Sequence, residues 1–166
     1  TDRDKLLEWN NTDFDLNTDI CLHQKFEEQV KNNHDHIAIS DISTELSYKE
    51  FNTHINRLAP LLIEKGLENE EIVCVCLDRS IELMIAIYAI HKAGGAYLPV
   101  DPNYPSERLS MILDDADPRY IITIQKNSEN IGPRPNNIFI DNILTSPLSD
   151  NDSNPNLSTS SNSLAY

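Results

Sequence analysis

The chain has 166 residues, of which 39% are hydrophobic and 24% are charged, and its formal net charge is −14. This length is enough for one domain with a hydrophobic core, and the negative charge gives no electrostatic support for binding nucleic acid or an anionic membrane surface. No apolar run approaches the roughly 20 residues that span a bilayer, and the polar start at residues 1–5 does not resemble a secretion signal. We therefore expect a cytoplasmic protein without a nucleic-acid or membrane partner.

Residues 1–33 are predicted to form a lead-in arm. Within this arm, residues 21–30 have helical spacing, with Leu22, Phe26 and Val30 on one stripe.

A short strand at residues 37–39 and a long helix come next. Ser47 and Glu50 have the spacing of a capping box, so the helix should begin there, and Gly66 should close it. Pro60 lies inside this helix and should kink it, because proline removes a backbone hydrogen bond.

The apolar run at residues 72–77 predicts a buried strand, and its period of two places Cys74 and Cys76 on one face. With Cys21 they make three cysteines, which do not form a disulfide framework and are expected to be reduced. A metal site is the alternative, but no Cys-x-x-Cys or His-x-x-x-His pattern accompanies them.

In the next segment, a predicted helix is followed by a predicted strand with almost no connecting loop. Helical spacing begins near Ser80 and should stop at Gly94, where a positive φ is available, and Gly95 allows a close backbone approach. The apolar run at residues 97–100 then predicts a strand, and Pro99 favours an edge position or the end of the strand.

A helix is expected from Pro105 to Asp117, followed by strands at residues 120–124 and 138–140. Strands that alternate with helices of this length indicate βαβ units. The predicted fold class is α/β, with a mostly parallel sheet flanked by helices.

The composition changes at Thr145, after which a Ser/Asn-rich stretch contains almost nothing that forms a core. We expect three parts: the arm at residues 1–33, a domain at residues 34–144 and a flexible tail at residues 145–166. The last three residues, 164–166, are typical of the opening of a new strand.

Three segments together resemble one known family. Residues 91–109 are similar to the KAGGAYLPVDP-x-YPxER signature of amino-acid adenylation domains of non-ribosomal peptide synthetases, within the acyl-adenylate-forming (AMP-dependent) ligases. Residues 46–59 resemble the first motif of these domains, from which Pro60 departs. The Trp-Asn-x-Thr element at residues 9–12 and the His-x-x-Phe-Glu-x-Gln helix at residues 23–29 resemble the linker between a condensation and an adenylation domain. Alternatively, Trp9 and Phe26 pack the arm onto the core.

The resemblance covers about residues 4–124 and implies an incomplete N-terminal subdomain of an adenylate-forming ligase. The parent reaction it implies joins an amino acid to ATP, forming an aminoacyl-adenylate and pyrophosphate, and then a thioester on the phosphopantetheine of a carrier domain. ATP and magnesium are thus implied for the parent. The implied partners are the remainder of the adenylation domain, the neighbouring condensation and carrier domains, and an MbtH-like protein at residues 96–111.

These 166 residues are expected to hold no catalytic, cofactor-binding or metal residue. The four glycines form no phosphate-binding loop, and the histidines are scattered. The acidic pairs are expected to be solvated, Glu107 and Arg108 to brace a helix start, and Lys92 to belong to the structural signature without a catalytic role. Whether the chain is an enzyme is left open. It is expected to be inactive alone, and the alternatives are a docking module or one half of a split enzyme.

Overall fold

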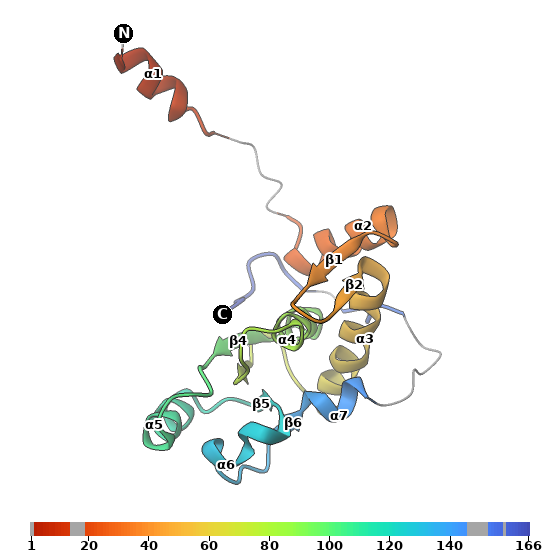
Figure 1. Ribbon diagram of the computed structural model, residues 1–166, viewed down its shortest axis with the longest axis vertical. Coiled ribbons are helices and arrows are strands. Elements are labelled where there is room, and N and C mark those ends of the chain that lie inside the picture. Colours follow the sequence, from red (N-terminus) through yellow and green to blue (C-terminus); the bar gives the residue numbers. More distant parts are fainter. Residues whose placement is uncertain (1, 14–18, 146–152, 158) are drawn as a thin grey trace.

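The computed structural model describes residues 2–13, 19–145, 153–157 and 159–166, and Figure 1 shows helices packed around a parallel sheet. The helices are α1 (Asp2–Trp9), α2 (Leu22–Asn33), α3 (Tyr48–Glu64), α4 (Ile81–Lys92), α5 (Ser106–Ala116), α6 (Ser128–Ile131) and α7 (Ile140–Leu144), with a 3₁₀ turn, η1 (Gln125–Asn127). The strands are β1 (Ile37–Ser40), β2 (Glu45–Ser47), β3 (Ile72–Val75), β4 (Ala96–Pro99), β5 (Tyr120–Thr123) and β6 (Asn137–Phe139). Among the described residues, no helix is both long enough and apolar enough to cross a bilayer.

Four strands form the main sheet in the order β4-β3-β5-β6, and every pairing is parallel. β4 is an edge strand, with Pro99 opposite Val75. The predicted edge position of Pro99 is confirmed, and so is the α/β class with a parallel sheet.

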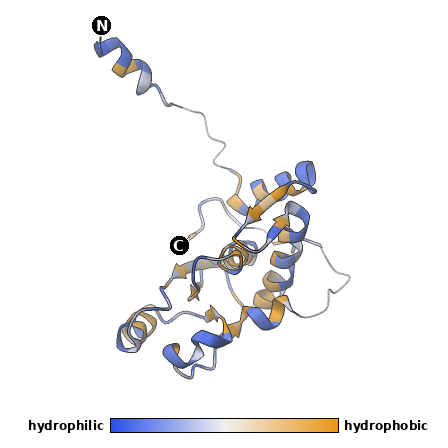
Figure 2. Cartoon of the chain, in the orientation of Figure 1, coloured by the Kyte–Doolittle hydropathy of each residue, from blue (hydrophilic) through white to orange (hydrophobic). Residues whose placement is uncertain are grey.

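The two faces of this sheet are covered by different helices. Val73 and Val75 of β3 belong to the larger core cluster, together with buried side chains of α3 and α4. Cys74 and Cys76 belong to a smaller cluster, together with Leu109 and other buried side chains of α5. The apolar sides of these helices turn inward in Figure 2. The predicted alternation along the strand is confirmed.

The two buried cysteines are unreactive thiols. Both are free and at most 1% exposed. Burial raises the pKa of Cys74 to about 12 and that of Cys76 to about 11, so both stay protonated at neutral pH.

Five of the described elements were not expected from the sequence, namely α1, β2, η1, α6 and α7. β2 pairs with β1 as an antiparallel hairpin, whose turn is closed by the Asp41 carboxylate accepting from the backbone N–H groups of Ser43 and Thr44, each at 2.8 Å. Such an Asx turn needs few residues, and three-residue strands carry little periodicity. The short helix α7 begins at Ile140, which was expected to continue the last strand.

α3, α4 and α5 begin and end within two residues of the predicted positions, whereas α2 continues to Asn33, three residues beyond the predicted segment. The Ser47 hydroxyl accepts from the backbone N–H of Glu50 at 3.2 Å, and the Glu50 carboxylate accepts from that of Ser47 at 2.9 Å, which confirms the capping box. α3 continues through Pro60 to its end. α5 starts one residue after Pro105, and it ends at Asp117, whose φ is +41°.

The lead-in arm follows only part of the expected packing. Phe26 is 7% exposed, and its ring centroid lies 4.8 Å from that of Tyr88. Trp9 on α1 is 70% exposed, and Figure 1 shows α1 apart from the sheet. Phe26 therefore packs onto the core as expected, whereas Trp9 does not.

The two glycines between α4 and β4 are required for different reasons, Gly94 for its backbone conformation and Gly95 for the space around it. Gly94 has φ +84°, which a side chain rarely adopts. At Gly95 a Cβ atom would lie 3.0 Å from Leu67 Cδ2, 3.1 Å from the Glu71 carbonyl oxygen and 3.2 Å from Ile90 Cγ2. The close approach predicted for this pair is confirmed at Gly95.

Replacing Gly95 by alanine should therefore overpack the junction and lower the free energy of unfolding by about 1–3 kcal/mol. Chemical denaturation measures this loss. A second variant that carries Leu67→Val as well should lose less than the sum of the two single changes, because the shorter side chain relieves part of the crowding. If the losses of the two single variants add up in the double variant, Leu67 is not the side chain that crowds the added methyl group at residue 95.

Candidate functional site

The most polar buried cluster of the described residues surrounds Lys92, the last residue of α4. Lys92 is only 2% exposed, although lysine is almost never fully buried without partners. The sequence analysis assigned this lysine to a structural signature and gave it no partner.

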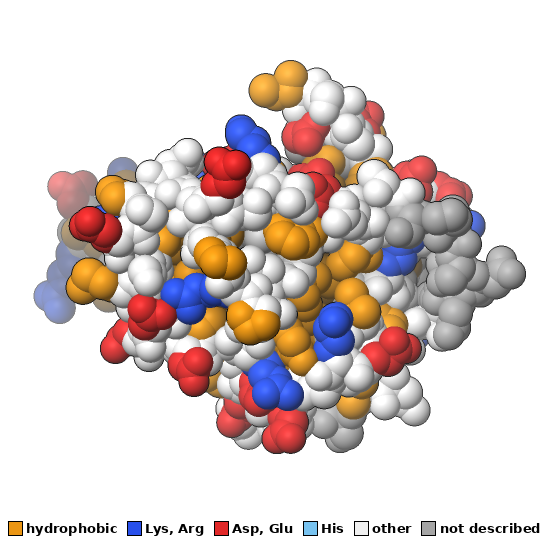
Figure 3. Space-filling view, turned by 90° about the horizontal axis from the view of Figure 1, so that it is seen from below, with side chains coloured by type: hydrophobic (Ala, Val, Ile, Leu, Met, Phe, Trp, Pro, Cys, Tyr) orange, Lys and Arg blue, Asp and Glu red, His pale blue; other side chains and the backbone are white. Residues whose placement is uncertain are grey.

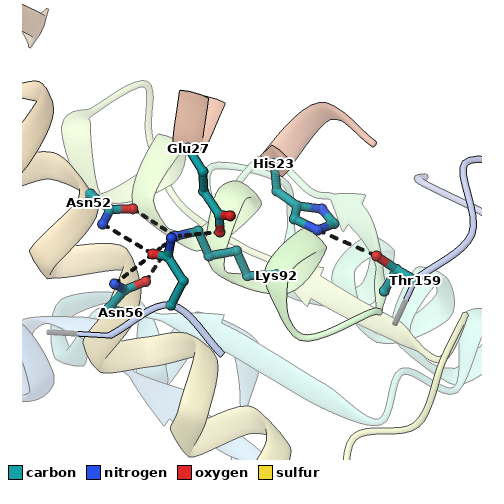
Figure 4. Close-up of polar contacts among 7 residues, drawn as sticks. His23, Glu27, Asn52, Asn56, Lys92 and Thr159 are labelled. Atoms are coloured by element: carbon teal, nitrogen blue, oxygen red, sulfur yellow. Dashed lines mark hydrogen bonds and ion pairs between the residues drawn. The ribbon is translucent and has the colours of Figure 1, made fainter. Parts of the chain in front are cut away.

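Four oxygen atoms surround the Lys92 ammonium (Figure 4). Nζ donates to Asn52 Oδ1 at 2.7 Å and to Asn56 Oδ1 at 2.9 Å, both on α3. It also donates to Asn154 Oδ1 at 2.8 Å and lies 3.1 Å from Glu27 Oε1 on α2. The single cation therefore joins α2, α3, α4 and a residue from the Ser/Asn-rich stretch.

The two asparagines of α3 connect the cation to Asn154 a second time. Asn52 and Asn56 are four residues apart and so share one face of the helix. Their Nδ2 groups donate to Asn154 Oδ1 at 3.2 and 2.9 Å. Asn154 Oδ1 thus accepts from three donors, one of which is charged.

Electrostatics explain why Glu27 belongs to the cluster. Burial lowers the pKa of Lys92, and the Glu27 carboxylate opposes that shift. The Phe26 ring lies 5.9 Å from Nζ and presents its face to the cation. With every donor of the ammonium engaged, Lys92 offers nothing to a substrate, which agrees with the structural role expected for it.

The described residues 153–157 and 159–166 form a strap along the ends of α4 and β4; we call this the C-terminal strap. Thr159 Oγ1 lies 3.4 Å from His23 Nε2, as Figure 4 shows. The Leu164 N–H donates to Glu70 Oε1 at 3.1 Å, and the Tyr97 N–H of β4 donates to the Ala165 carbonyl at 3.0 Å.

Part of the flexible tail expected at residues 145–166 therefore makes defined contacts, while residues 146–152 and 158 lie outside the described residues. Ala165 accepts one backbone hydrogen bond at the free edge of β4, but residues 164–166 have no strand assignment, so the strand expected to open there stays a prediction.

A small cavity of about 240 Å³ lies between the strap and the ends of α2 and α4. Its walls include Cys21, His23, His91 and Thr159. Burial lowers the pKa of both His23 and His91, so both rings are neutral at pH 7. The volume is below the roughly 300–1,000 Å³ of ordinary ligand sites.

Two other candidate side chains, Arg108 and Asp114, have structural partners. The Arg108 guanidinium lies 4.1 Å from the centroid of the Tyr104 ring, which agrees with bracing of the start of α5. Asp114 pairs with Arg134 at 2.8 Å, and this contact lowers the pKa of the carboxyl. Within the described ranges, no three His, Cys, Asp or Glu side chains are grouped as a metal site requires.

Comparison with known proteins identifies the family. A model of the family described as AMP-binding enzyme matches residues 26–163. The chain belongs to this family. Gramicidin S synthase 2 of Brevibacillus brevis is 37% identical over 136 residues, which are 82% of this chain and 3% of that protein. Gramicidin S synthase 1 of the same organism is 43% identical over 114 residues, which are 69% of this chain and 10% of that protein.

Among solved structures, the AMPPNP-bound form of the non-ribosomal peptide synthetase FmoA3 aligns with a TM-score of 0.75 and 26% identity. The alignment covers 89% of this chain and 16% of that chain. The chain thus corresponds to the N-terminal part of an adenylation domain of a non-ribosomal peptide synthetase, and it spans a small fraction of its relatives' length.

Lys92→Met should lower the free energy of unfolding by roughly 3 kcal/mol, because it leaves the Glu27 carboxylate and three amide oxygens without their cation. Chemical denaturation measures the loss, with Lys126→Met as the control because Lys126 is exposed. Equal stability of the two variants would contradict the structural role assigned to Lys92.

Proposed function

We propose that this chain is the N-terminal part of an amino-acid-activating domain in a non-ribosomal peptide synthetase. The complete domain would join an amino acid to ATP and then transfer the aminoacyl group to the phosphopantetheine of a carrier domain. The observation that carries this proposal is the match of residues 26–163 to the AMP-binding family, within relatives that are multidomain peptide synthetases. Neighbouring condensation and carrier domains are the expected partners, and three free thiols suit the reducing cytoplasm in which we expect it to act.

The residues of this chain do not by themselves fit ATP and magnesium. A triphosphate needs a glycine-rich loop and a free cation, and magnesium needs carboxylate ligands. The four glycines lie at positions 66, 94, 95 and 132 in no such arrangement, and Lys92 is fully engaged by protein oxygens. We therefore assign the 166 residues the role of scaffold and derive no catalytic step from them.

Exposed apolar side chains support an interface with the remainder of the domain. The strap carries Leu157, Leu164 and Tyr166, which are 38%, 51% and 81% exposed. On the face of Figure 3, apolar side chains are also visible between charged ones. The remainder of the adenylation domain is the partner that we expect to cover such surfaces.

Two other roles remain proposals beside this one. One half of a split enzyme would need a second polypeptide that supplies the phosphate loop. A docking module would bind a small partner such as an MbtH-like protein, and the observation in its favour is Met111 on α5, which is 73% exposed.

Amino-acid-dependent exchange between ATP and pyrophosphate tests the proposal. The purified 166 residues should give no exchange with any proteinogenic amino acid. The same residues fused to the rest of an adenylation domain, taken from gramicidin S synthase 1, should give exchange above that of a fusion that carries a folded, unrelated domain in their place.

Exchange by the 166 residues alone would overturn the assignment as a scaffold. A fusion that folds and stays inactive would contradict the activating role and favour the docking module.

A further inference from the structure

We propose that Lys92 is a positioning residue that, through Asn154, fixes the path by which the C-terminal strap reaches the free edge of β4. The inference rests on the contacts of Lys92, Asn154 and Ala165, and it assigns no catalytic step to any of them.

The strap has few apolar contacts with the core. None of its described residues is fully buried, its large apolar side chains are largely exposed, and its ring contact is that of Tyr166, whose centroid lies 5.8 Å from that of Tyr97. A segment with little buried apolar area is held mainly by its polar contacts, because little hydrophobic free energy opposes its release.

Among these polar contacts, those of Asn154 combine a charged donor and two amide donors on one oxygen atom. Its Oδ1 accepts from the ammonium of Lys92 at 2.8 Å and from the amides of Asn52 and Asn56. Hydrogen bonds that involve an ionised group are stronger than neutral ones. Of the other strap contacts, Thr159 forms a neutral pair with His23, and the Leu164 N–H makes a single bond to the exposed Glu70 carboxylate. The Ala165 carbonyl accepts from the Tyr97 N–H and lies 3.4 Å from His91 Nε2.

Lys92 lies beside the turn that leads from α4 to β4. It lies two residues before Gly94, where α4 turns toward β4, and a Cβ atom at Gly94 would lie 3.4 Å from Thr159 Cγ2 of the strap. Lys92 therefore connects the strap to the same turn that places β4. Past this turn, the Ala165 carbonyl accepts from the Tyr97 N–H on the outer side of the edge strand.

The consequence for catalysis rests on the proposed function. If the chain is the front of an adenylation domain, the segment that follows Ala165 starts from a point set by Lys92 and Asn154. The positioning itself is a property of these 166 residues and is tested without ATP.

Amide hydrogen exchange followed by NMR on the 166-residue chain provides this test. The Tyr97 amide reports on the docking of Ala165, and the Cys76 amide, which donates to the Ile122 carbonyl at 2.9 Å, reports on the sheet interior. Asn154→Ala should speed exchange at Tyr97 by about tenfold or more while the Cys76 amide stays protected, because loss of a charge-assisted anchor lowers the free energy of local opening.

Two matched variants make the test specific. Asn156→Ala removes the same side chain from an exposed position of the strap and should leave exchange at Tyr97 unchanged. Asn154→Asp keeps an oxygen facing Lys92 and the two amide donors, so it should protect Tyr97 at least as well as the native asparagine.

The proposal is overturned if Asn154→Ala leaves exchange at Tyr97 as it is, or if Asn156→Ala speeds it equally. It is also overturned if the Tyr97 amide of the Asn154→Asp variant exchanges as fast as that of Asn154→Ala, or if Tyr97 is no less protected than Cys76 in the Asn154→Ala variant, since the strap would then be released only when the whole fold opens.

Discussion

A buried ammonium group is the constraint on which the arrangement of this chain depends. Lys92 is withdrawn from water at the end of α4, and a charge in that position is stable only where oxygen atoms surround it. Glu27, Asn52, Asn56 and Asn154 supply those oxygens from three other segments. The relative positions of α2, α3, α4 and the strap are therefore coupled through the Nζ atom of Lys92.

The sheet provides the rigid frame around this cation. β3 divides its side chains between two cores, so that α3 and α4 cover one face and α5 covers the other. The edge strand β4 remains open toward the strap, where Tyr97 and Ala165 meet. A scaffold of this kind matches the N-terminal part of an adenylation domain, where it would hold a catalytic apparatus that other residues supply.

Most of the frame was predictable because its signals are local in sequence. The period of two at Cys74 and Cys76, the capping box at Ser47 and the proline of an edge strand each depend on residues within a few positions of one another. Family resemblance extended the same conclusion to the class of enzyme, because its motifs lie in the same segments. The short hairpin was missed because three residues are too few to show a period.

The cluster around Lys92 was not predictable for the opposite reason. Asn154 lies 62 positions further along the chain, in a stretch whose composition indicated only a flexible tail. A single asparagine in such a stretch carries no periodic signal, and a lysine at a helix end is usually solvated. Only the folded arrangement brings the two side chains together.

A double-mutant cycle between Lys92→Met and Asn154→Ala, followed by chemical denaturation, tests this account most directly. If the two side chains act as one unit, Asn154→Ala should cost much less stability when Lys92 is already absent, with a coupling energy of about 1–3 kcal/mol. A coupling energy near zero would contradict the account, because the strap would then be held independently of the buried cation.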